Sequence, residues 1–405
     1  MVTQHADASD PTQGKGFYPS FHALWHLETL RVIDNTQDFA SCAWEKAAQA
    51  ATPDRIAIMD TTVDWEHPNL NGAIDTANMQ DFSSLNSGDL VDTKTGPTIY
   101  GAHGTAVAGL IGARPVRADL LRPERVGLTS IDECGTKKEI ALPYAGINPF
   151  CQMIPVSLSA APDPDMVLGA LDYIDKLRDK PQIIVVAAAW DDTIRVAEDA
   201  PSFDPSEGRW SAVTERLRQI CETTLVLCAA GNSGAHALSY PASLAGSFPG
   251  LVAVTACDID GKPLTYAYHP KPGDTSVIAT LSTQASRYDR DLAFLDPWAE
   301  VDPYLKRPDP AQHFPKQRII SLDPRGRRGY NPSIYRYTPP ADGPHLEIAS
   351  LFAEFSGTSA ATAIAAGLIS LAMQSEGKSV RPALKKDAFA GIRGLFDLDA
   401  ARRVF

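Results

Sequence analysis

The sequence predicts an α/β fold with a mostly parallel central sheet and helices on both of its faces, which gives three layers. Short apolar runs rich in Ile and Val occur along the chain, and such runs are typical of strands that are buried on both sides. Stretches with helical periodicity alternate with these runs. This alternation is typical of a parallel sheet whose strands are joined by crossover helices.

The expected elements follow one another along most of the chain. Apolar runs are expected to form buried strands at residues 56–59, 152–156, 183–186, 225–227 and 251–254. Periodic segments are expected to form helices at residues 105–113, 165–180, 213–223 and 359–374. In parallel sheets of this kind, chemistry gathers beyond the carboxyl ends of the strands. Residues that directly follow a strand are therefore the first candidates for a functional site.

Two stretches interrupt the alternation. Residues 114–143 carry several charges and few periodic apolar positions, and residues 258–345 are rich in Pro, Asp and Arg. We interpret both as surface insertions, because long loops in compact domains are usually functional or disordered. The basic cluster at residues 325–328 is interpreted as a solvated loop, with an exosite or a self-cleavage site as alternatives.

Composition and charge limit the classes of function. The chain has 405 residues, of which 44% are hydrophobic and 21% are charged, as expected of a globular protein with a substantial core. The net charge of −12 argues against a nucleic-acid partner, because phosphate binding needs a basic surface. The longest apolar stretches, residues 183–190 and 363–373, are too short to cross a bilayer.

The expected location is the cytoplasm. The first twenty residues are polar and contain no apolar core of a secretory signal. The six cysteines are scattered, without a CxxC pair or the spacing of a zinc site. Dispersed cysteines in a large chain fit a reducing compartment at least as well as a set of disulfides.

Asp60 and His103 are the first two candidate catalytic residues. Asp60 directly follows the expected strand 56–59, and a carboxylate held there can orient an imidazole. His103 precedes a helix rich in small residues, and its neutral ring can accept a proton from a hydroxyl and pass it to a leaving amine. The structural alternatives are a turn residue for Asp60 and a helix cap for His103.

Ser359 and Asn232 complete the set. Ser359 opens the expected helix 359–374, where its hydroxyl is exposed and its backbone N–H points to the place where an oxyanion would form. Asn232 follows a buried strand, and its amide can donate a second hydrogen bond to that oxyanion. An N-cap and a turn residue are the structural alternatives. The occurrence of all four residue types in the order Asp, His, Asn, Ser favours catalysis.

The segments around these residues resemble the subtilisin-like serine protease family. The matching motifs lie at residues 58–61, 103–105, 230–232 and 357–362. The resemblance implies a three-layer α/β/α fold with one peptidase domain over residues 23–405, preceded by a polar extension over residues 1–22. It also implies a serine endopeptidase in which Ser359 is the nucleophile, His103 the base, Asp60 its orienting residue and Asn232 part of the oxyanion hole.

Two other functions use the same scaffold. One is an inactive binding scaffold, and the other is a peptide ligase or macrocyclase in which an amine resolves the acyl-enzyme. Thr62 stands where the family usually has glycine, so the local geometry after Asp60 is in question. Ala363 and Ile364 replace the family's usual Pro-His pair, for which we expect altered packing rather than lost activity.

The resemblance also suggests residues for substrate binding. Ala189, Trp190 and Gly231 lie in the segments that contact substrate in the family. Asp191 and Asp192 follow Trp190, as acidic residues do in the kexin branch, and are expected to form a pocket for a basic residue before the cut. A solvated loop after the strand is the alternative.

Regulation and metals are the last expectations. Secreted members of the family carry an inhibitory segment ahead of the catalytic domain, and about twenty residues precede the resemblance here. We therefore expect narrow specificity or a regulatory protein partner. No cofactor is required for the chemistry. A structural calcium ion is common in the family, and Asp64 and Asp81 are acidic residues that can bind a cation or simply be solvated.

Overall fold

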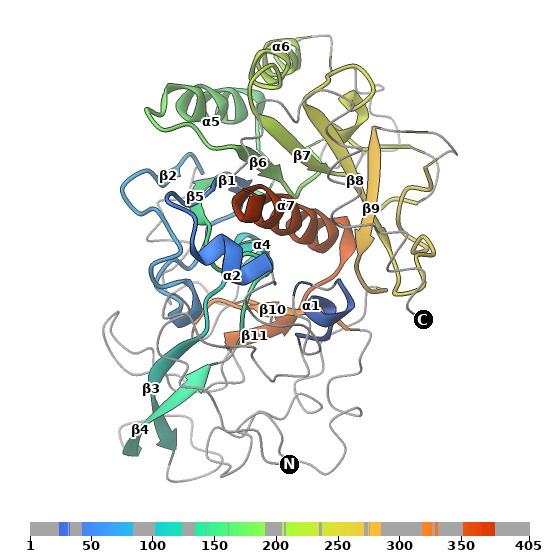
Figure 1. The fold of residues 1–405 in the computed structure, drawn as a ribbon. Coiled ribbons are helices and arrows are strands. Elements are labelled where there is room, and N and C mark those ends of the chain that lie inside the picture. Colours follow the sequence, from blue (N-terminus) through green and yellow to red (C-terminus); the bar gives the residue numbers. More distant parts are fainter. Residues whose placement is uncertain are drawn as a thin grey trace.

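A parallel sheet of seven strands forms the centre of the described part of the molecule (Figure 1). The strand order is β2-β5-β1-β6-β7-β8-β9, and every neighbouring pair runs parallel. The strands are β1 (Arg55–Asp60), β2 (Gln80–Asp81), β5 (Gln152–Ser157), β6 (Ile183–Val186), β7 (Leu225–Ala229), β8 (Leu251–Cys257) and β9 (Val277–Leu281). The expected parallel α/β fold is confirmed.

The structure is a computed structural model of the chain. It describes residues 24–30, 32, 43–83, 102–123, 134–142, 144–160, 162–190, 205, 208–234, 237–270, 274, 276–284, 318–325, 329–330 and 351–376. The expected N-terminal extension over residues 1–22 lies outside these residues.

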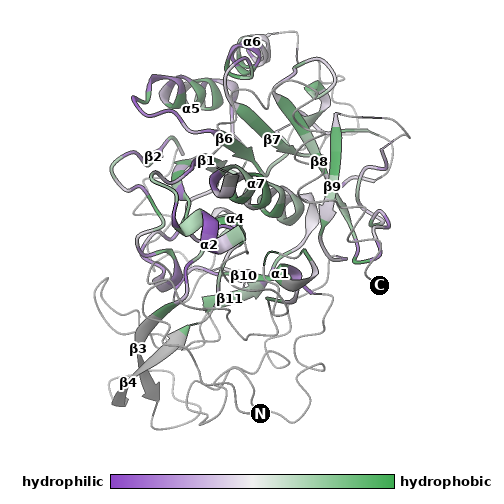
Figure 2. Ribbon diagram, viewed as in Figure 1, coloured by the Kyte–Doolittle hydropathy of each residue, from purple (hydrophilic) through white to green (hydrophobic). Residues whose placement is uncertain are grey.

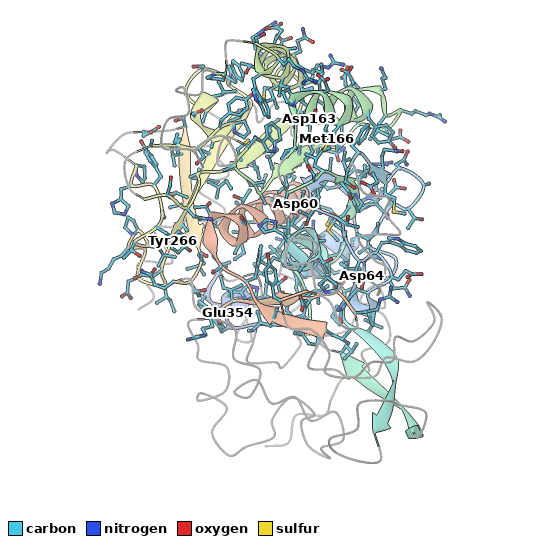
Figure 3. The ribbon with its side chains drawn as sticks, turned by 180° about the vertical axis from the view of Figure 1, so that it is seen from behind. Asp60, Asp64, Asp163, Met166, Tyr266 and Glu354 are labelled. Carbon is cyan, nitrogen blue, oxygen red and sulfur yellow. The ribbon has the colours of Figure 1, made fainter. Side chains whose placement is uncertain are left out.

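Helices cover both faces of the sheet, and side chains fill the space between the layers (Figures 1 and 3). One face carries α5 (Pro164–Lys176) and α6 (Trp210–Ile220). The other carries α1 (Trp25–Thr29), α2 (Ala43–Ala48), α4 (His103–Gly112) and α7 (Gly357–Glu376).

Alternate residues of the central strands enter two separate hydrophobic cores. In β1, Ile56 and Ile58 pack in the core that contains α4 and α7, whereas Ala57 and Met59 pack in the core of α5 and α6. Burial on both faces explains why the strand sequences are continuously apolar. Figure 2 shows this apolar character in the central strands and in α7, and polar residues on the outer helices α5 and α6.

Helix α7 is the core helix of the molecule. Among the described helices, its stretch Gly357–Ser375 is the one that is long and apolar enough to cross a membrane, and it is entirely buried in the fold. It contacts α2, α4 and four strands of the sheet. Its first turn therefore has a fixed position relative to the carboxyl ends of the strands.

Helix boundaries differ from expectation by a few residues. Helix α4 begins at His103 rather than at residue 105, and α5 ends at Lys176 rather than at residue 180. Pro181 accounts for the non-helical conformation of the residue before it, Lys180. The helix itself ends four residues earlier, where Leu177 leaves the helical conformation.

The structure adds order to both expected insertions. Residues 114–143 contain an antiparallel pair, β3 (Val116–Pro123) and β4 (Cys134–Leu142). The interpretation of residues 258–345 as a surface insertion needs a correction, because β9 lies within them and pairs with β8 in the central sheet. A second strand from this stretch, β10 (Ile320–Leu322), pairs with β11 (Phe352–Glu354). Pro and Asp are frequent in this stretch and are unfavourable in strands, so the sequence did not predict these short strands.

Candidate active site

Asp60 is the last residue of β1, at the carboxyl edge of the sheet. Its side chain is almost completely buried, with 2% exposed. The oxygen Oδ1 accepts hydrogen bonds from the backbone N–H of Thr61 and from Nδ1 of His103, each at 2.7 Å. Two donors on one oxygen fix the orientation of the carboxylate.

His103 is held at Asp60 by the start of α4. The N–H of Gly104 donates to the hydroxyl of Thr61 at 2.9 Å, which joins the first turn of the helix to the end of β1. A Cβ atom at Gly104 would lie 2.1 Å from the carbonyl oxygen of Thr61, so only glycine permits this approach. The ring of His103 also packs edge-on against Phe355, with 5.1 Å between the ring centroids.

The Asp60 contact sets the chemistry of the imidazole. Burial disfavours the charged ring, but the charge of Asp60 and its hydrogen bond outweigh burial and raise the pKa of His103 above its ordinary value. When the neutral ring donates through Nδ1 to the carboxylate, Nε2 is left as an acceptor. The arrangement can therefore take a proton from a hydroxyl that lies at Nε2.

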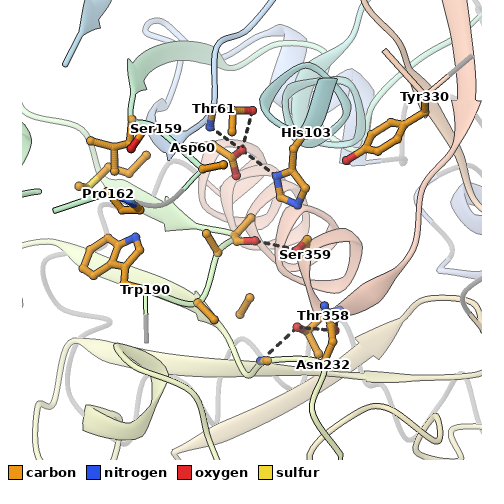
Figure 4. Close-up of a pocket in the computed structure, with 18 residues that line it drawn as sticks. Asp60, Thr61, His103, Ser159, Pro162, Trp190, Asn232, Tyr330, Thr358 and Ser359 are labelled. Atoms are coloured by element: carbon orange, nitrogen blue, oxygen red, sulfur yellow. Dashed lines mark hydrogen bonds and ion pairs between the residues drawn. The ribbon is translucent and has the colours of Figure 1, made fainter. Parts of the chain in front are cut away.

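Ser359 lies in the first turn of α7 and lines the same cavity as Asp60 and His103, a space of about 310 Å³ (Figure 4). Its hydroxyl donates to the carbonyl oxygen of Ala187, just beyond β6, at 2.7 Å. The residue is 7% exposed, so most of it is enclosed by the fold. The motifs at residues 58–61, 103–105 and 357–362 thus meet at one cavity, although they are far apart in the sequence.

Asn232 follows β7 and is fixed by the same turn of α7. Its Oδ1 accepts from the backbone N–H of Thr358 at 2.9 Å and from the hydroxyl of Thr358 at 3.1 Å. The Thr358 hydroxyl in turn accepts from the N–H of Gly231 at 3.2 Å. Because Oδ1 is occupied, Nδ2 is the group that Asn232 can offer to a ligand.

Three of the expected substrate-binding residues, Ala189, Trp190 and Gly231, line the cavity. Trp190 is 1% exposed and stacks on Trp210 at 6.3 Å, and its backbone N–H donates to the carbonyl oxygen of Tyr240 at 2.8 Å. The Tyr240–Pro241 peptide bond is cis. The other two expected residues, Asp191 and Asp192, lie outside the described residues.

Several residues that line the cavity were not predicted from the sequence. Ser159 and Pro162 follow β5, and Tyr330 comes from the stretch that we interpreted as an insertion. Ser159 could have been predicted as a site residue from its position after an expected strand, because such positions lie at the carboxyl edge of the sheet. No local pattern marks Tyr330.

The acidic residues considered for a cation differ in their contacts. Asp64 is buried and forms an ion pair with Arg325, whose Nη2 lies 2.9 Å from Oδ1, and the same Nη2 contacts Glu66 at 2.6 Å. Burial opposes ionisation of Asp64, but the charge and the hydrogen bonds of Arg325, together with the charge of His67, outweigh burial and lower the pKa of the carboxyl. Asp81 accepts from the N–H of Ser83 at 2.8 Å. Calcium binding stays a prediction.

Arg325 does not match the interpretation of a solvated basic cluster, because its side chain is 11% exposed and paired. Residues 326–328 of that cluster lie outside the described residues. Within the described part of the chain, no group of three His, Cys, Asp or Glu residues is arranged to hold a metal ion.

Comparisons with known proteins agree with the fold. A model of the Subtilase family matches residues 55–321. A search of curated proteins finds no match. Among solved structures, the Aeromonas sobria serine protease in complex with the chaperone ORF2 is similar with a TM-score of 0.54 and 16% identity; the match covers 94% of this chain and 59% of that chain.

Two further solved structures are similar. The nisin leader peptidase NisP from Lactococcus lactis has a TM-score of 0.50 and 13% identity, covering 89% of this chain and 86% of that chain. The prenylagaramide maturation protease PagA has a TM-score of 0.46 and 19% identity, covering 84% and 85%. At these identities the similarity shows the fold alone.

Proposed function

We propose, from the premise that this chain belongs to the subtilase family, that it is a serine endopeptidase with Ser359 as its nucleophile. The family makes it a serine peptidase that acts on peptides or proteins. The observation that supports the finer proposal is the convergence of Asp60, His103, Ser359 and Asn232 at one cavity. The hydrogen bond of 2.7 Å between His103 and Asp60 supports the proposal, because acyl transfer needs a base whose ring is oriented by such a carboxylate.

The proposed reaction has two halves. Ser359 Oγ attacks the scissile carbonyl carbon while Nε2 of His103 takes its proton and then gives it to the departing amine. Water attacks the resulting ester, His103 takes a proton from this water, and Ser359 leaves with that proton. In each half, the carbonyl oxygen becomes an oxyanion that the N–H of Ser359 and Nδ2 of Asn232 stabilise. Asp60 stays ionised and holds the imidazolium.

One conformational step precedes the attack. The Ser359 hydroxyl donates to the carbonyl oxygen of Ala187, so it must leave this acceptor before it can donate to His103. Catalytic hydrogen bonds often tighten only when substrate is bound. The contact with Ala187 also favours the second candidate, an inactive binding scaffold, in which the hydroxyl would keep this partner.

A labelling experiment separates these candidates. Wild-type protein and Ser359→Ala would be treated with a fluorophosphonate probe and measured by intact mass. A single adduct on wild type and none on the variant supports the peptidase. No adduct on folded wild type supports the inactive scaffold. The mass of the products from a peptide then distinguishes hydrolysis from ligation, in which an amine replaces water.

Cleavage after a basic residue is a further part of the proposal. It rests on Asp191 and Asp192, which directly follow Trp190 in the sequence. The test compares the cleavage rates of two peptides that differ only in having Arg or Gln before the cut. Faster cleavage of the Arg peptide by wild type, lost in Asp191→Asn/Asp192→Asn, supports the acidic pocket. Equal rates for the two peptides in wild type contradict it.

Cofactor, location and partner complete the proposal. The nucleophile, the base and the oxyanion donors all belong to this chain, so we propose that labelling is unchanged by EDTA. Cys151, Cys221 and Cys228 are free and buried, which supports a cytoplasmic location because reducing compartments maintain free thiols. Narrow specificity and control by a protein partner remain parts of the same proposal.

A further inference from the structure

We infer that Tyr330 is a specificity-determining residue of this site. Tyr330, supported from behind by the buried Phe355, forms the wall of the cleft on the side of the leaving amine and selects an aromatic or large apolar residue directly after the scissile bond. The inference rests on the proposed function and adds a substrate class to it.

The position of Tyr330 is the first argument. Tyr330 lines the same cavity as His103 and Ser359. Figure 4 shows it beside His103, across Ser359 from Trp190, with its hydroxyl directed toward the cavity. Within the described part of the chain this hydroxyl has no hydrogen-bond partner, so it remains available to a substrate.

The second argument is a row of three aromatic rings, in which the buried Phe355 lies between Tyr330 and His103. The ring of Tyr330 packs against Phe355 at 6.2 Å between centroids, with an interplanar angle of 40°. Phe355 packs edge-on against His103 at 5.1 Å and 75°. A further aromatic ring of a substrate can extend this row, because aromatic pairs attract one another beyond the burial of area.

Proton transfer identifies which part of a substrate meets this wall. Nδ1 of His103 is bonded to Asp60, so the proton of Ser359 must pass through Nε2 to the leaving amine. The amine therefore departs next to His103, and the acyl part lies on the other side of Ser359, toward Trp190. Tyr330 stands on the His103 side (Figure 4), where it meets the residue that follows the cut.

The wall is fixed before substrate arrives. The N–H of Tyr330 donates to Oδ1 of Asp323 at 2.9 Å, and the N–H of Asp323 donates to the carbonyl oxygen of Leu351 at 2.9 Å. Gly329 has a φ of +87°, and a Cβ there would lie 2.3 Å from Asp323 Oδ1, so only glycine fits. The ion pair of Arg325 with Asp64 anchors the same segment. Preorganised walls give sharper selection than mobile ones.

Charge defines what the wall rejects. Burial, followed by the charges of Asp60 and Asp323, raises the pKa of Tyr330. Oδ1 of Asp323 accepts from the N–H of Tyr330 at 2.9 Å, and Asp60 lines the same cavity as Tyr330. An acidic side chain placed against Tyr330 would therefore be repelled by these two carboxylates. The expected order of preference for the residue after the cut is Phe above Gly, and Gly above Glu.

The test uses three proteins: wild type, Tyr330→Ala and Tyr330→Phe. A digest of denatured proteins first identifies one cleaved sequence by mass spectrometry. Synthetic peptides with that sequence and Phe, Gly or Glu after the cut then give kcat/KM values. Wild type should favour Phe over Gly by roughly tenfold or more, as an apolar contact of this size provides. Tyr330→Ala should reduce the ratio to about threefold or less, and Tyr330→Phe should keep it.

An ester substrate provides the matched control. A methyl ester of the same acyl sequence has no residue after the cut, so its hydrolysis should be equal in all three proteins. Equal fluorophosphonate labelling shows that Ser359 is equally reactive in each. An unchanged Phe-to-Gly ratio in Tyr330→Ala, or a parallel loss of ester hydrolysis, would overturn the inference while the peptidase proposal stands. Absence of labelling in wild type would overturn the proposed function and this inference together.

Discussion

Polar residues lie at both ends of β1 and near both ends of helix α7, and the two ends differ in what those residues face. At the carboxyl end of β1, Asp60 holds His103, and the first turn of α7 brings Ser359 to the same cavity (Figure 4). These groups are aimed at a space that a substrate can enter. We refer to this set as the cavity cluster.

At the opposite end, the polar residues satisfy one another. The Nδ2 of Asn148 donates to Ser370 at 2.8 Å and to Gln374 at 3.1 Å, and the Ser370 hydroxyl donates to Asp54 at 3.2 Å. The Nε2 of Gln374 donates to the carbonyl oxygen of Ala47 at 3.1 Å. This set, the enclosed cluster, joins the last turns of α7 to the start of β1 and to α2.

The comparison shows that a partly buried polar group with a shifted pKa is not by itself a sign of catalysis. Burial raises the pKa of Asp54 to about 6, more than the hydrogen bond from Ser370 lowers it. Asp54 nevertheless belongs to the enclosed cluster and does not line the described cavity. What distinguishes the cavity cluster is that its residues line one cavity and that Asp60 is hydrogen-bonded to His103 there.

The largest expected effect is that of Ser359→Ala. Turnover should fall on the order of a million-fold, because the nucleophile is lost. The unfolding midpoint should change little, since one hydroxyl at the cavity is removed. Peptide hydrolysis and urea unfolding measure the two quantities. Residual turnover close to that of wild type would show that the cavity cluster is not the catalytic site.

Asp60→Asn should reduce kcat roughly ten-thousand-fold, because the amide stabilises the wrong tautomer of His103. It should also change the pH profile. Catalysis needs neutral His103, whose pKa Asp60 raises, so activity of wild type is lost as pH falls through a midpoint above about 6.5. Without the carboxylate, the midpoint should move to lower pH. An unchanged midpoint in the residual activity would contradict the role of Asp60.

Arg325→Met tests the support of the cavity cluster. Removing the guanidinium leaves Asp64 buried and unpaired, which should cost about 3–5 kcal/mol in the free energy of unfolding. Asp64→Asn/Arg325→Met should recover a large part of this loss, because no charge remains unpaired. Urea unfolding of both variants is the measurement. Equal loss in the single and double variants would show that the ion pair is not the cause.

Asp54 gives the enclosed cluster its own dependence on pH. Its pKa is about 6 in the folded chain against an ordinary value of 3.8 for an exposed Asp, so the folded state binds the proton more tightly. The stabilisation is fully present below pH 3.8 and is lost as pH rises through about 6, amounting to about 3 kcal/mol. In Asp54→Asn this component should be absent. Urea unfolding at pH 4.5 and 7.5 compares the two proteins, and identical pH dependence would contradict the assignment.

The smallest effect is expected for Ser370→Ala, which is the matched control for Ser359→Ala on the same helix. It removes one hydrogen bond to Asp54 and one acceptor for Asn148, at a cost of about 1–3 kcal/mol in stability. Peptide hydrolysis should stay within about twofold of wild type, because the residue is far from the nucleophile along α7. A large loss of activity in a folded variant would mean that the two ends of α7 are coupled.

The order of the expected elements and the four candidate residues could be predicted because each depends on nearby sequence. Strands β1 and β5 to β8 are short apolar runs, and Asp60 directly follows one such run in the expected pattern. Ser359 and His103 stand at the starts of two helices with many small residues. Strand ends and helix starts are local features that periodicity and turn-forming residues mark.

Strand β9, Tyr330 and the Arg325–Asp64 pair could not be predicted in this way. Asp64 and Arg325 are 261 positions apart, and the sequence around each of them does not indicate that the two form a pair. Strand β9 is short and lies in a stretch whose Pro and Asp content favours loops. Its pairing with β8 outweighs that composition, because tertiary context overrides weak strand propensity.

The sequence by itself therefore determined the parallel α/β fold and the identity of the candidate acid–base and nucleophilic residues. The tertiary structure decided which of the remaining residues share the cavity, which acidic group is paired, and which partner the Ser359 hydroxyl takes. The physical reason is that side-chain chemistry and periodicity are properties of neighbouring residues, whereas a cavity wall forms only when segments hundreds of residues apart pack against one another.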